Sequence, residues 1–125
     1  MKTYRSCLLI DDNPLDNFIN TKIIHRANFA SEILAIERPE EALELLRNGK
    51  FRPDVIFLDI RMPVMDGFDF LDEYEKLEID RDNTKIIMLT SSINPGDLER
   101  AKRYKHVSKY ITKTLTPDIL LQIAS

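Results

Sequence analysis

Short apolar runs alternate along this chain with segments of helical spacing, and this alternation constrains the fold more than any other feature. Apolar residues fill each run, and each run is short enough to be one strand. Such alternation is typical of βαβ units around a parallel sheet. We therefore expect an α/β fold, a doubly wound (βα)5 domain with a five-stranded parallel sheet. The expected strands lie at residues 6–10, 32–36, 55–58, 85–89 and 109–111.

The expected helices are marked by residues that favour helix ends. The first begins at Pro14, with Asp12 or Asn13 as its N-cap. Gly49 permits the left-handed backbone conformation that ends the second helix. The other helices are expected to end near residues 77, 105 and 125. The spacing of its apolar residues is expected to put Leu15, Phe18, Ile19 and Ile23 on one face of the first helix.

Length and composition predict a single domain over residues 1–125, too short to hold a second folded module. Lys and Arg number 18 against 21 Asp and Glu, and the net charge of −3 disfavours direct binding to nucleic acid.

Cys7 has no second cysteine to pair with, which suits a reducing compartment. No apolar stretch approaches the roughly 20 residues of a membrane helix, and no signal peptide precedes the first strand. We expect a cytoplasmic protein without a membrane segment.

Polar side chains follow four of the expected strands. Asp11 and Asp12 follow the first, Asp59 the third, Thr90 the fourth and Lys113 the fifth. Because the carboxyl ends of parallel strands share one edge of a sheet, these side chains are expected to converge there, where ligands of open α/β sheets bind. Each residue alone has an ordinary explanation as a helix cap, turn residue or surface lysine. Their joint placement indicates a site.

The three carboxylates of this expected site require a cation. Unit charges about 4 Å apart repel by roughly 4 kcal/mol at an effective dielectric constant near 20. Hard oxygen ligands favour Mg²⁺ over the metals that thiolate or imidazole ligands select. The sequence therefore predicts a magnesium site formed by Asp11, Asp12 and Asp59.

The same residues carry a resemblance to a known family. Asp11-Asp12, Asp59 followed by Met-Pro-x-x-Asp-Gly, Thr90 and Lys113 resemble the receiver domain of two-component response regulators, most closely the single-domain chemotaxis-regulator type. The resemblance spans nearly the whole chain. It implies the flavodoxin-like strand order 2-1-3-4-5 and a single receiver domain without an output domain.

The resemblance also implies the chemistry. Asp59 would be the phosphoacceptor, and it would attack a phosphoryl group carried by a histidine kinase, a histidine phosphotransfer protein or a small donor. Asp12, Asp59 and the backbone carbonyl of Arg61 would bind Mg²⁺ directly, and Asp11 would act through water. Lys113 would neutralise the transferring oxygens together with the ion.

Four further positions bear on signalling. Thr90 matches the family's switch hydroxyl and Tyr110 the aromatic residue that turns inward with it, so both are expected to move on phosphorylation. Arg61 and Ser92 occupy variable positions beside the path of water to the acyl phosphate, and we hypothesise that they tune its lifetime.

Thr114 stands where the family usually has proline after the lysine. Because a cis bond before a non-proline residue costs roughly 2.5–4 kcal/mol, against about 0.5–1 before proline, a trans or rearranged peptide is an alternative there, and the sequence leaves this geometry open.

Several functions stay open at this level. The receiver could signal to a separate target protein or pass its phosphate to a downstream histidine as a phosphorelay intermediate. Phosphatases of the haloacid-dehalogenase type also use a strand-end Asp with Mg²⁺, but they need a second Asp where this chain has Arg61. An interaction module without phosphorylation would require a disabled pocket. The apolar last helix could also form, with the fourth helix and fifth strand, a homodimer or partner face.

Overall fold

The computed structural model describes residues 4–80 and 82–124 of the chain. In these residues five strands form one parallel sheet in the order β2-β1-β3-β4-β5, which confirms the expected topology. The strands are β1 (Tyr4–Ile10), β2 (Ala30–Ile36), β3 (Val55–Leu58), β4 (Lys85–Thr90) and β5 (Val107–Thr112). The helices are α1 (Pro14–Arg26), α2 (Pro39–Arg47), α3 (Gly67–Glu75), α4 (Pro95–Ala101) and α5 (Pro117–Ala124).

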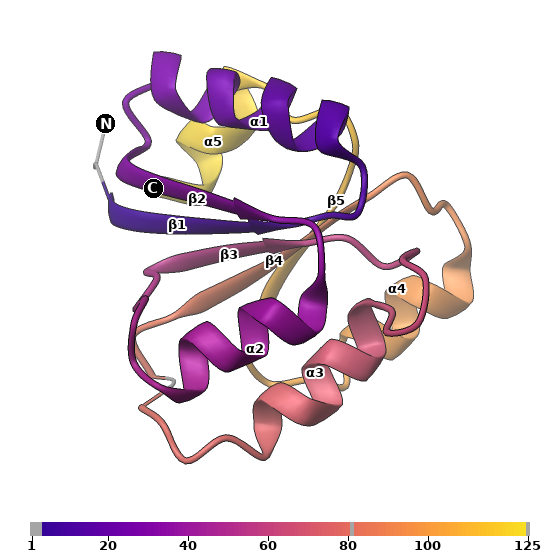
Figure 1. Cartoon of the computed structure of the whole chain (residues 1–125). Helices are drawn as coiled ribbons and strands as arrows, with labels where there is room; N and C mark the ends of the chain where they lie inside the picture. The colour runs from indigo at the N-terminus through magenta and orange to yellow at the C-terminus, as the bar shows by residue number, and fades with distance from the viewer. Residues whose placement is uncertain (1–3, 81, 125) are drawn as a thin grey trace.

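The helices cover both faces of the sheet. α1 and α5 lie on one face, and α2, α3 and α4 lie on the other (Figure 1). Because successive strand side chains point to opposite faces, β1 sends Leu8 and Ile10 into the core under α2 and α3, and Cys7 and Leu9 into the core under α1 and α5. A sheet buried on both faces explains why the strands read as continuous apolar runs.

Of the four apolar residues expected on one face of α1, Ile23 packs against the core, but the other three do not form the buried face of the helix. Leu15, Phe18 and Ile19 are 62%, 60% and 41% exposed, whereas Asn17 and Asn20 are buried. The Asn17 amide donates a hydrogen bond of 2.8 Å to the Asp11 carbonyl at the end of β1. This bond fixes the rotation of the helix, and the apolar residues beside it are left in solvent. The helix buries Asn17, Asn20 and Ile24 instead.

Helix ends follow the local chemistry. Asn13 caps α1, since its side chain accepts hydrogen bonds from the amides of Leu15 and Asp16, and Gly49 after α2 has a φ of 74° as expected. The helices α3 and α4 end earlier than predicted. After α4 the chain turns back toward β4. The His106 carbonyl accepts a hydrogen bond from the Ile86 amide of β4, and β5 begins at Val107, earlier than the predicted residue 109.

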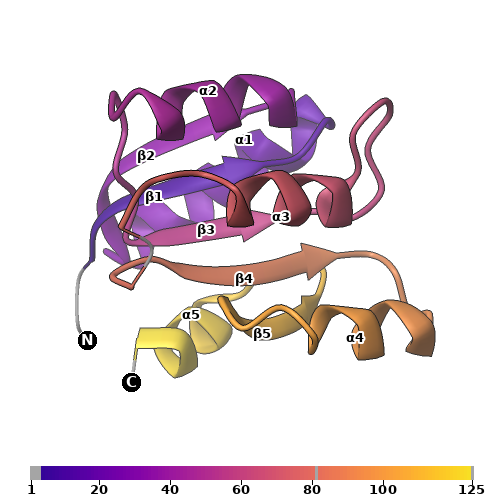
Figure 2. The ribbon, with the colours of Figure 1, turned by 90° about the horizontal axis from the view of Figure 1, so that it is seen from below.

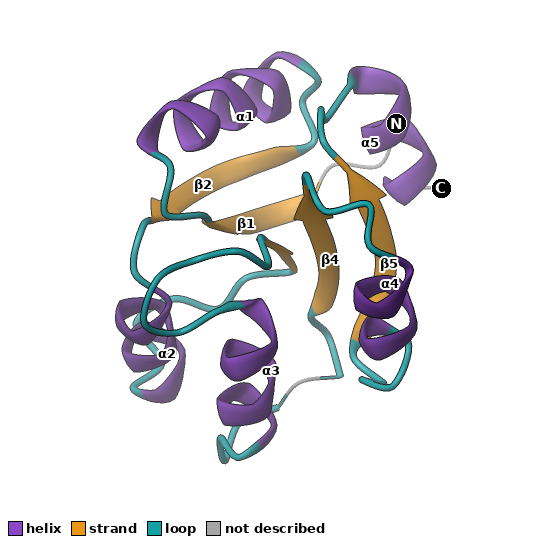
Figure 3. Ribbon diagram, turned by 90° about the vertical axis from the view of Figure 1, so that its right-hand side faces the viewer, coloured by secondary structure: helices purple, strands orange, loops and turns teal. Residues whose placement is uncertain are grey.

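One edge of the sheet gathers the loops that matter for function. The loops after β1, β3 and β4 lie on the right of Figure 1, and Figure 3 turns this side toward the viewer. β5 is at the end of the sheet order, beside β4, with α4 and α5 near it (Figure 2). Within residues 4–80 and 82–124, no helix is long and apolar enough to cross a membrane.

Candidate functional site

Three carboxylates meet at the carboxyl edge of the two central strands. β1 and β3 are neighbours with Ile10 opposite Leu58, so the residues that follow them are also adjacent. The Asp59 amide donates to the Ile10 carbonyl at 3.0 Å, which continues the pairing past the strand end. Asp11, Asp12 and Asp59 each place a carboxylate oxygen within 4.8 Å of the others. The predicted convergence of these three residues is confirmed.

Lys113 reaches into this cluster from the end of β5. Its ammonium lies 2.7 Å from Asp11, 2.8 Å from Asp16 and 3.5 Å from Asp59. The sequence analysis did not identify Asp16, which stands in the first turn of α1. Its only sequence signal is an acidic residue at a helix start, and that is ordinary at any helix.

Burial and charge shift the ionisation of the two best-connected groups. Burial raises the pKa of the Asp11 carboxyl, and the hydrogen bonds from Lys113 and the Asn13 amide offset this only in part. Burial alone would lower the pKa of the Lys113 ammonium. Its hydrogen bonds to Asp11 and Asp16 and the charge of Asp59 outweigh that effect and raise this pKa. The ammonium is therefore charged at neutral pH. One such cation among four carboxylates leaves the cluster negative, and the all-oxygen donor set fits a hard divalent cation.

The Asp66-Gly67 pair after Asp59 requires glycine at its second position because the backbone packs closely there. A Cβ at Gly67 would lie 2.4 Å from the backbone carbonyl oxygen of Asp59 and 3.0 Å from Cα of Ile60. The Gly67 amide donates to the Ile60 carbonyl at 2.9 Å, and Asp66 and Asp69 form a capping box at the start of α3. The loop after β3 is thus fastened to α3 by a contact that only glycine permits.

Thr90 and Lys113 are joined through the backbone. Thr90 is fully buried at the end of β4, and its carbonyl accepts a hydrogen bond of 2.9 Å from the Lys113 amide. The Thr90 hydroxyl accepts a hydrogen bond of 3.2 Å from the Ser92 amide. The peptide bond between Lys113 and Thr114, whose geometry the sequence left open, is cis. Contacts on both sides hold this segment, including the bond to Thr90 and the burial of Leu115.

The loop after β4 is tied to the loop after β3 and to β5. The Arg61 guanidinium pairs with Asp97 of α4 at 2.5 Å, and the Ser92 hydroxyl donates to the same Asp97 oxygen at 2.6 Å. The Tyr110 hydroxyl donates to the Ser92 carbonyl at 3.2 Å. Arg61, Ser92 and Tyr110 therefore belong to one network, in which Asp97, which the sequence analysis did not identify, joins Arg61 to Ser92.

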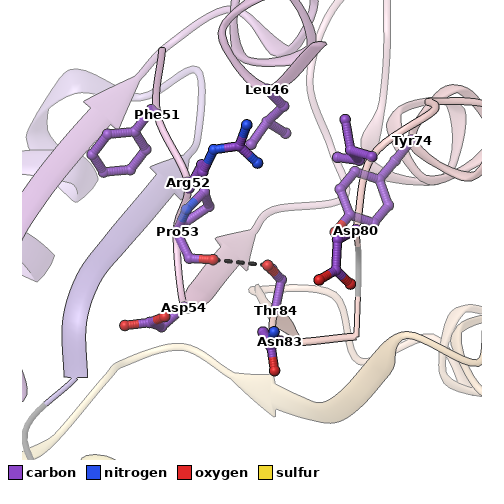
Figure 4. Close-up of a pocket in the computed structure, with 10 residues that line it drawn as sticks. Leu46, Phe51, Arg52, Pro53, Asp54, Tyr74, Asp80, Asn83 and Thr84 are labelled. Atoms are coloured by element: carbon purple, nitrogen blue, oxygen red, sulfur yellow. Dashed lines mark hydrogen bonds between the residues drawn. The ribbon is translucent and has the colours of Figure 1, made fainter. Parts of the chain in front are cut away.

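A cavity with a volume of about 140 Å³ lies at the opposite edge of the sheet (Figure 4). Its carboxylates serve the backbone: Asp54 accepts from the amides of Arg5 and Ser6, and Asp80 from that of Asp82. Across the cavity the Thr84 hydroxyl donates to the Pro53 carbonyl at 2.8 Å. These hydrogen bonds give the polar residues of the cavity a structural role. We therefore assign the functional site to the carboxyl edge of the sheet. Other lining residues include Leu46, Phe51, Arg52 and Tyr74.

Comparison with known proteins agrees with this site. The family model described as the response regulator receiver domain matches residues 7–125. The chain belongs to the response regulator receiver family. It is therefore a receiver domain of two-component signalling, and this assignment rules against the alternative of a haloacid-dehalogenase-type phosphatase.

Relatives place the same domain in different proteins. The sensor histidine kinase CheAY of Helicobacter pylori is 33% identical over 116 residues, which are 93% of this chain and 14% of the kinase. The probable methanogenesis regulatory protein FilR2 of Methanothrix harundinacea is 30% identical over 113 residues, which are 87% of this chain and 72% of that protein. The chain thus spans only a small part of the kinase.

Solved structures share the fold. The two-component response regulator from Cytophaga hutchinsonii is 28% identical, with a TM-score of 0.85 and 98% of each chain covered. The receiver domain of the sensor histidine kinase PA1611 from Pseudomonas aeruginosa has a TM-score of 0.79, covers 98% of this chain and 95% of its own, and is 24% identical. A magnesium ion is coordinated in the active-site cleft of the PA1611 domain.

Proposed function

We propose that this receiver accepts a phosphoryl group on Asp59 in a Mg²⁺-dependent reaction and signals through Thr90 and Tyr110 to a partner protein. The observation that carries the proposal is the placement of Asp59 among Asp11, Asp12 and the Lys113 ammonium. A carboxylate beside a fixed cation and a divalent-metal site can attack phosphorus, because the charge of the phosphoryl oxygens is neutralised there.

The magnesium ion would be held by the carboxylates of Asp12 and Asp59 and the backbone carbonyl of Arg61, with Asp11 acting through water. When bound, the ion neutralises charge on the phosphoryl oxygens. The oxygen-only donor set and the negative balance of the cluster support this assignment. The ion in the cleft of the related PA1611 domain supports it as well.

The chain's own groups orient the transfer. The Ile60 amide donates to one Asp59 oxygen at 2.8 Å, while the other oxygen faces Lys113. An Asp59 oxygen attacks phosphorus as the bond from phosphorus to the donor's imidazole nitrogen breaks, and the electron pair stays on the imidazole. Lys113 then pairs with a phosphoryl oxygen. Hydrolysis restores the carboxylate when water attacks the same phosphorus.

Signal output begins at Thr90. In the resting state its hydroxyl accepts from the Ser92 amide, and its own proton can be donated to a phosphoryl oxygen once that group is present. Movement of Thr90 toward the phosphoryl group carries Ser92 with it, and this strains the bond from Tyr110 to the Ser92 carbonyl. Release of the Tyr110 hydroxyl changes the surface of β5, α4 and α5, which we assign to target binding.

An apolar rim supports delivery of the phosphoryl group by another protein. Leu15 and Phe18 of α1, Val64 after β3 and Ile93 after β4 are 62%, 60%, 100% and 85% exposed. All four stand on α1 or on loops that follow the strand ends of the site. Exposed apolar side chains grouped in this way are typical of protein interfaces. A histidine kinase or histidine phosphotransfer protein is the partner that fits.

Intact-mass spectrometry tests the proposal. The protein is incubated with acetyl phosphate and Mg²⁺, and we expect a gain of one phosphoryl group that Asp59→Ala abolishes. Asp118→Ala removes an exposed carboxylate of α5 and serves as the matched control, which should label normally. An equal gain in Asp59→Ala would refute the assignment of the phosphoacceptor.

The direction of phosphate flow needs its own experiment. Incubation of the phosphorylated receiver with a histidine phosphotransfer protein distinguishes a phosphorelay intermediate from an end-point signal. Transfer of the phosphoryl group back to histidine supports the relay. Target binding that depends on phosphorylation, without such transfer, supports signalling by docking.

Self-association is the second partner arrangement that we include in this proposal. Leu98 of α4 and Leu121 of α5 are 37% and 50% exposed, and they flank β5. A homodimer through α4, β5 and α5 would cover these side chains. Sedimentation with and without phosphorylation tests this arrangement, and a monomer in both states excludes it.

A further inference from the structure

Asp97 is a charged residue that the proposed phosphotransfer does not use. It lies in the first turn of α4, and its side chain is 12% exposed. One oxygen of this carboxylate, Oδ2, accepts both from the Arg61 guanidinium at 2.5 Å and from the Ser92 hydroxyl at 2.6 Å. A carboxylate this buried needs such partners, because loss of one would leave most of its charge uncompensated.

Ser92 connects this pair to both proposed switch residues. Its amide donates to the Thr90 hydroxyl, its carbonyl accepts from Tyr110, and its hydroxyl accepts from the Asn94 amide at 3.3 Å while donating to Asp97. A change at Asp97 therefore reaches Thr90 and Tyr110 through one residue. The network spans the loop after β3, the loop after β4 and the edge strand.

We propose that Asp97 is a positioning residue that holds Arg61 in the resting state and competes with the phosphoryl group of Asp59 for its guanidinium. The proposal rests on the proposed phosphorylation of Asp59. Arg61 stands two residues after Asp59, and its planar guanidinium pairs bidentately with phosphoryl oxygens, which carry more charge than one carboxylate. Phosphorylation thus offers Arg61 a more highly charged partner two residues away in the sequence.

Transfer of Arg61 to the phosphoryl group has a consequence for the loop after β4. Asp97 then keeps only the Ser92 hydroxyl of its two side-chain partners and is no longer neutralised in a largely buried position. Moving Asp97 toward solvent relieves this cost and shifts the start of α4 and Ser92. Phosphorylation of Asp59 therefore changes the position of Tyr110 through Arg61, Asp97 and Ser92, independently of the Thr90 hydroxyl.

The competition predicts a defined pattern of phosphoryl lifetimes. The half-life of the acyl phosphate is measured after acetyl phosphate is removed, in wild type, Asp97→Asn, Arg61→Ala and the double variant. Asp97→Asn frees Arg61 to cover the phosphoryl oxygens, so the half-life is expected to lengthen by about 1.5-fold to fivefold, the range of a partly exposed ion pair. Arg61→Ala shortens it, and adding Asp97→Asn to Arg61→Ala has no further effect.

Two controls separate this role from a structural one. Asp118→Asn removes an exposed carboxylate from the first turn of α5 and should leave the half-life unchanged. Asp97→Glu keeps the charge and should have a half-life close to the wild-type value. An unchanged half-life in folded Asp97→Asn, or an equal effect with Arg61 absent, overturns the competition alone. A wild-type protein that takes up no phosphoryl group overturns the proposed function and the competition together.

Discussion

Replacing Gly67 with alanine tests how the loop after β3 positions Asp59. The added Cβ would lie 2.4 Å from the Asp59 carbonyl oxygen, and contacts under 3.0 Å essentially do not occur, so this carbonyl must retreat by about 0.6 Å. The obstacle is backbone on both sides, because Cα of Ile60 lies 3.0 Å away. No side-chain rotation can relieve it.

The cost follows from these contacts. Overpacking of this kind destabilises proteins by about 1–3 kcal/mol. Alanine in place of glycine in a helix gains up to about 1 kcal/mol, which offsets part of the loss. We expect Gly67→Ala to lower the free energy of unfolding by about 1–2 kcal/mol. Displacement of Asp59 should also slow phosphoryl uptake by about tenfold or more, since misplacement by 1 Å can cost 10²-fold.

Gly96→Ala is the matched control for urea unfolding and for labelling with acetyl phosphate. Gly96 is also in the first turn of a helix, but its Cβ would meet only the side chain of Asn94, at 3.2 Å. We expect it to match the wild-type stability within about 1 kcal/mol and to label at the wild-type rate. If Gly67→Ala were as stable and as readily labelled as Gly96→Ala, the reasoning about this contact would be refuted.

Three further predictions test other parts of the structure. Mg²⁺ at 100 times its dissociation constant should stabilise the wild type by about 2.7 kcal/mol in thermal unfolding, and Asp12→Asn should remove most of this gain; equal stabilisation of both proteins would contradict the metal site. Lys113→Met should lower the free energy of unfolding by about 1–3 kcal/mol without Mg²⁺, because Asp11 and Asp16 lose their shared cation; urea unfolding that matches the wild type would contradict this. Burial raises the pKa of the Cys7 thiol, so a thiol reagent at pH 8 should label Cys7 only after denaturation; rapid labelling of the folded protein would place Cys7 outside the core.

The sequence predicted the parts of the site that depend on strand ends. Asp11, Asp12, Asp59 and Lys113 each follow a short apolar run, and parallel pairing brings the ends of such runs to one edge. The strand order came from the family resemblance, since periodicity alone does not order strands. The apolar runs and the family resemblance indicated the same site, and the structure brings these four residues together.

The parts that the sequence missed depend on contacts between distant segments. The apolar spacing of α1 grouped Leu15 and Phe18 on one face, but the helix buries Asn17 instead, whose side chain donates a hydrogen bond to the Asp11 carbonyl. Asp97 is an ordinary first-turn acid in sequence, and its role depends on Arg61, 36 residues earlier. Local patterns contain no information on such pairs.

Identification of the modified residue is the most direct test of the central claim that Asp59 carries the phosphoryl group. An acyl phosphate on aspartate is reduced by borohydride to homoserine, and peptide mass mapping then locates the change. After incubation with acetyl phosphate and Mg²⁺, we predict homoserine at residue 59, and none when the metal is chelated. Phosphate on another residue, or homoserine at a different aspartate, would contradict the account.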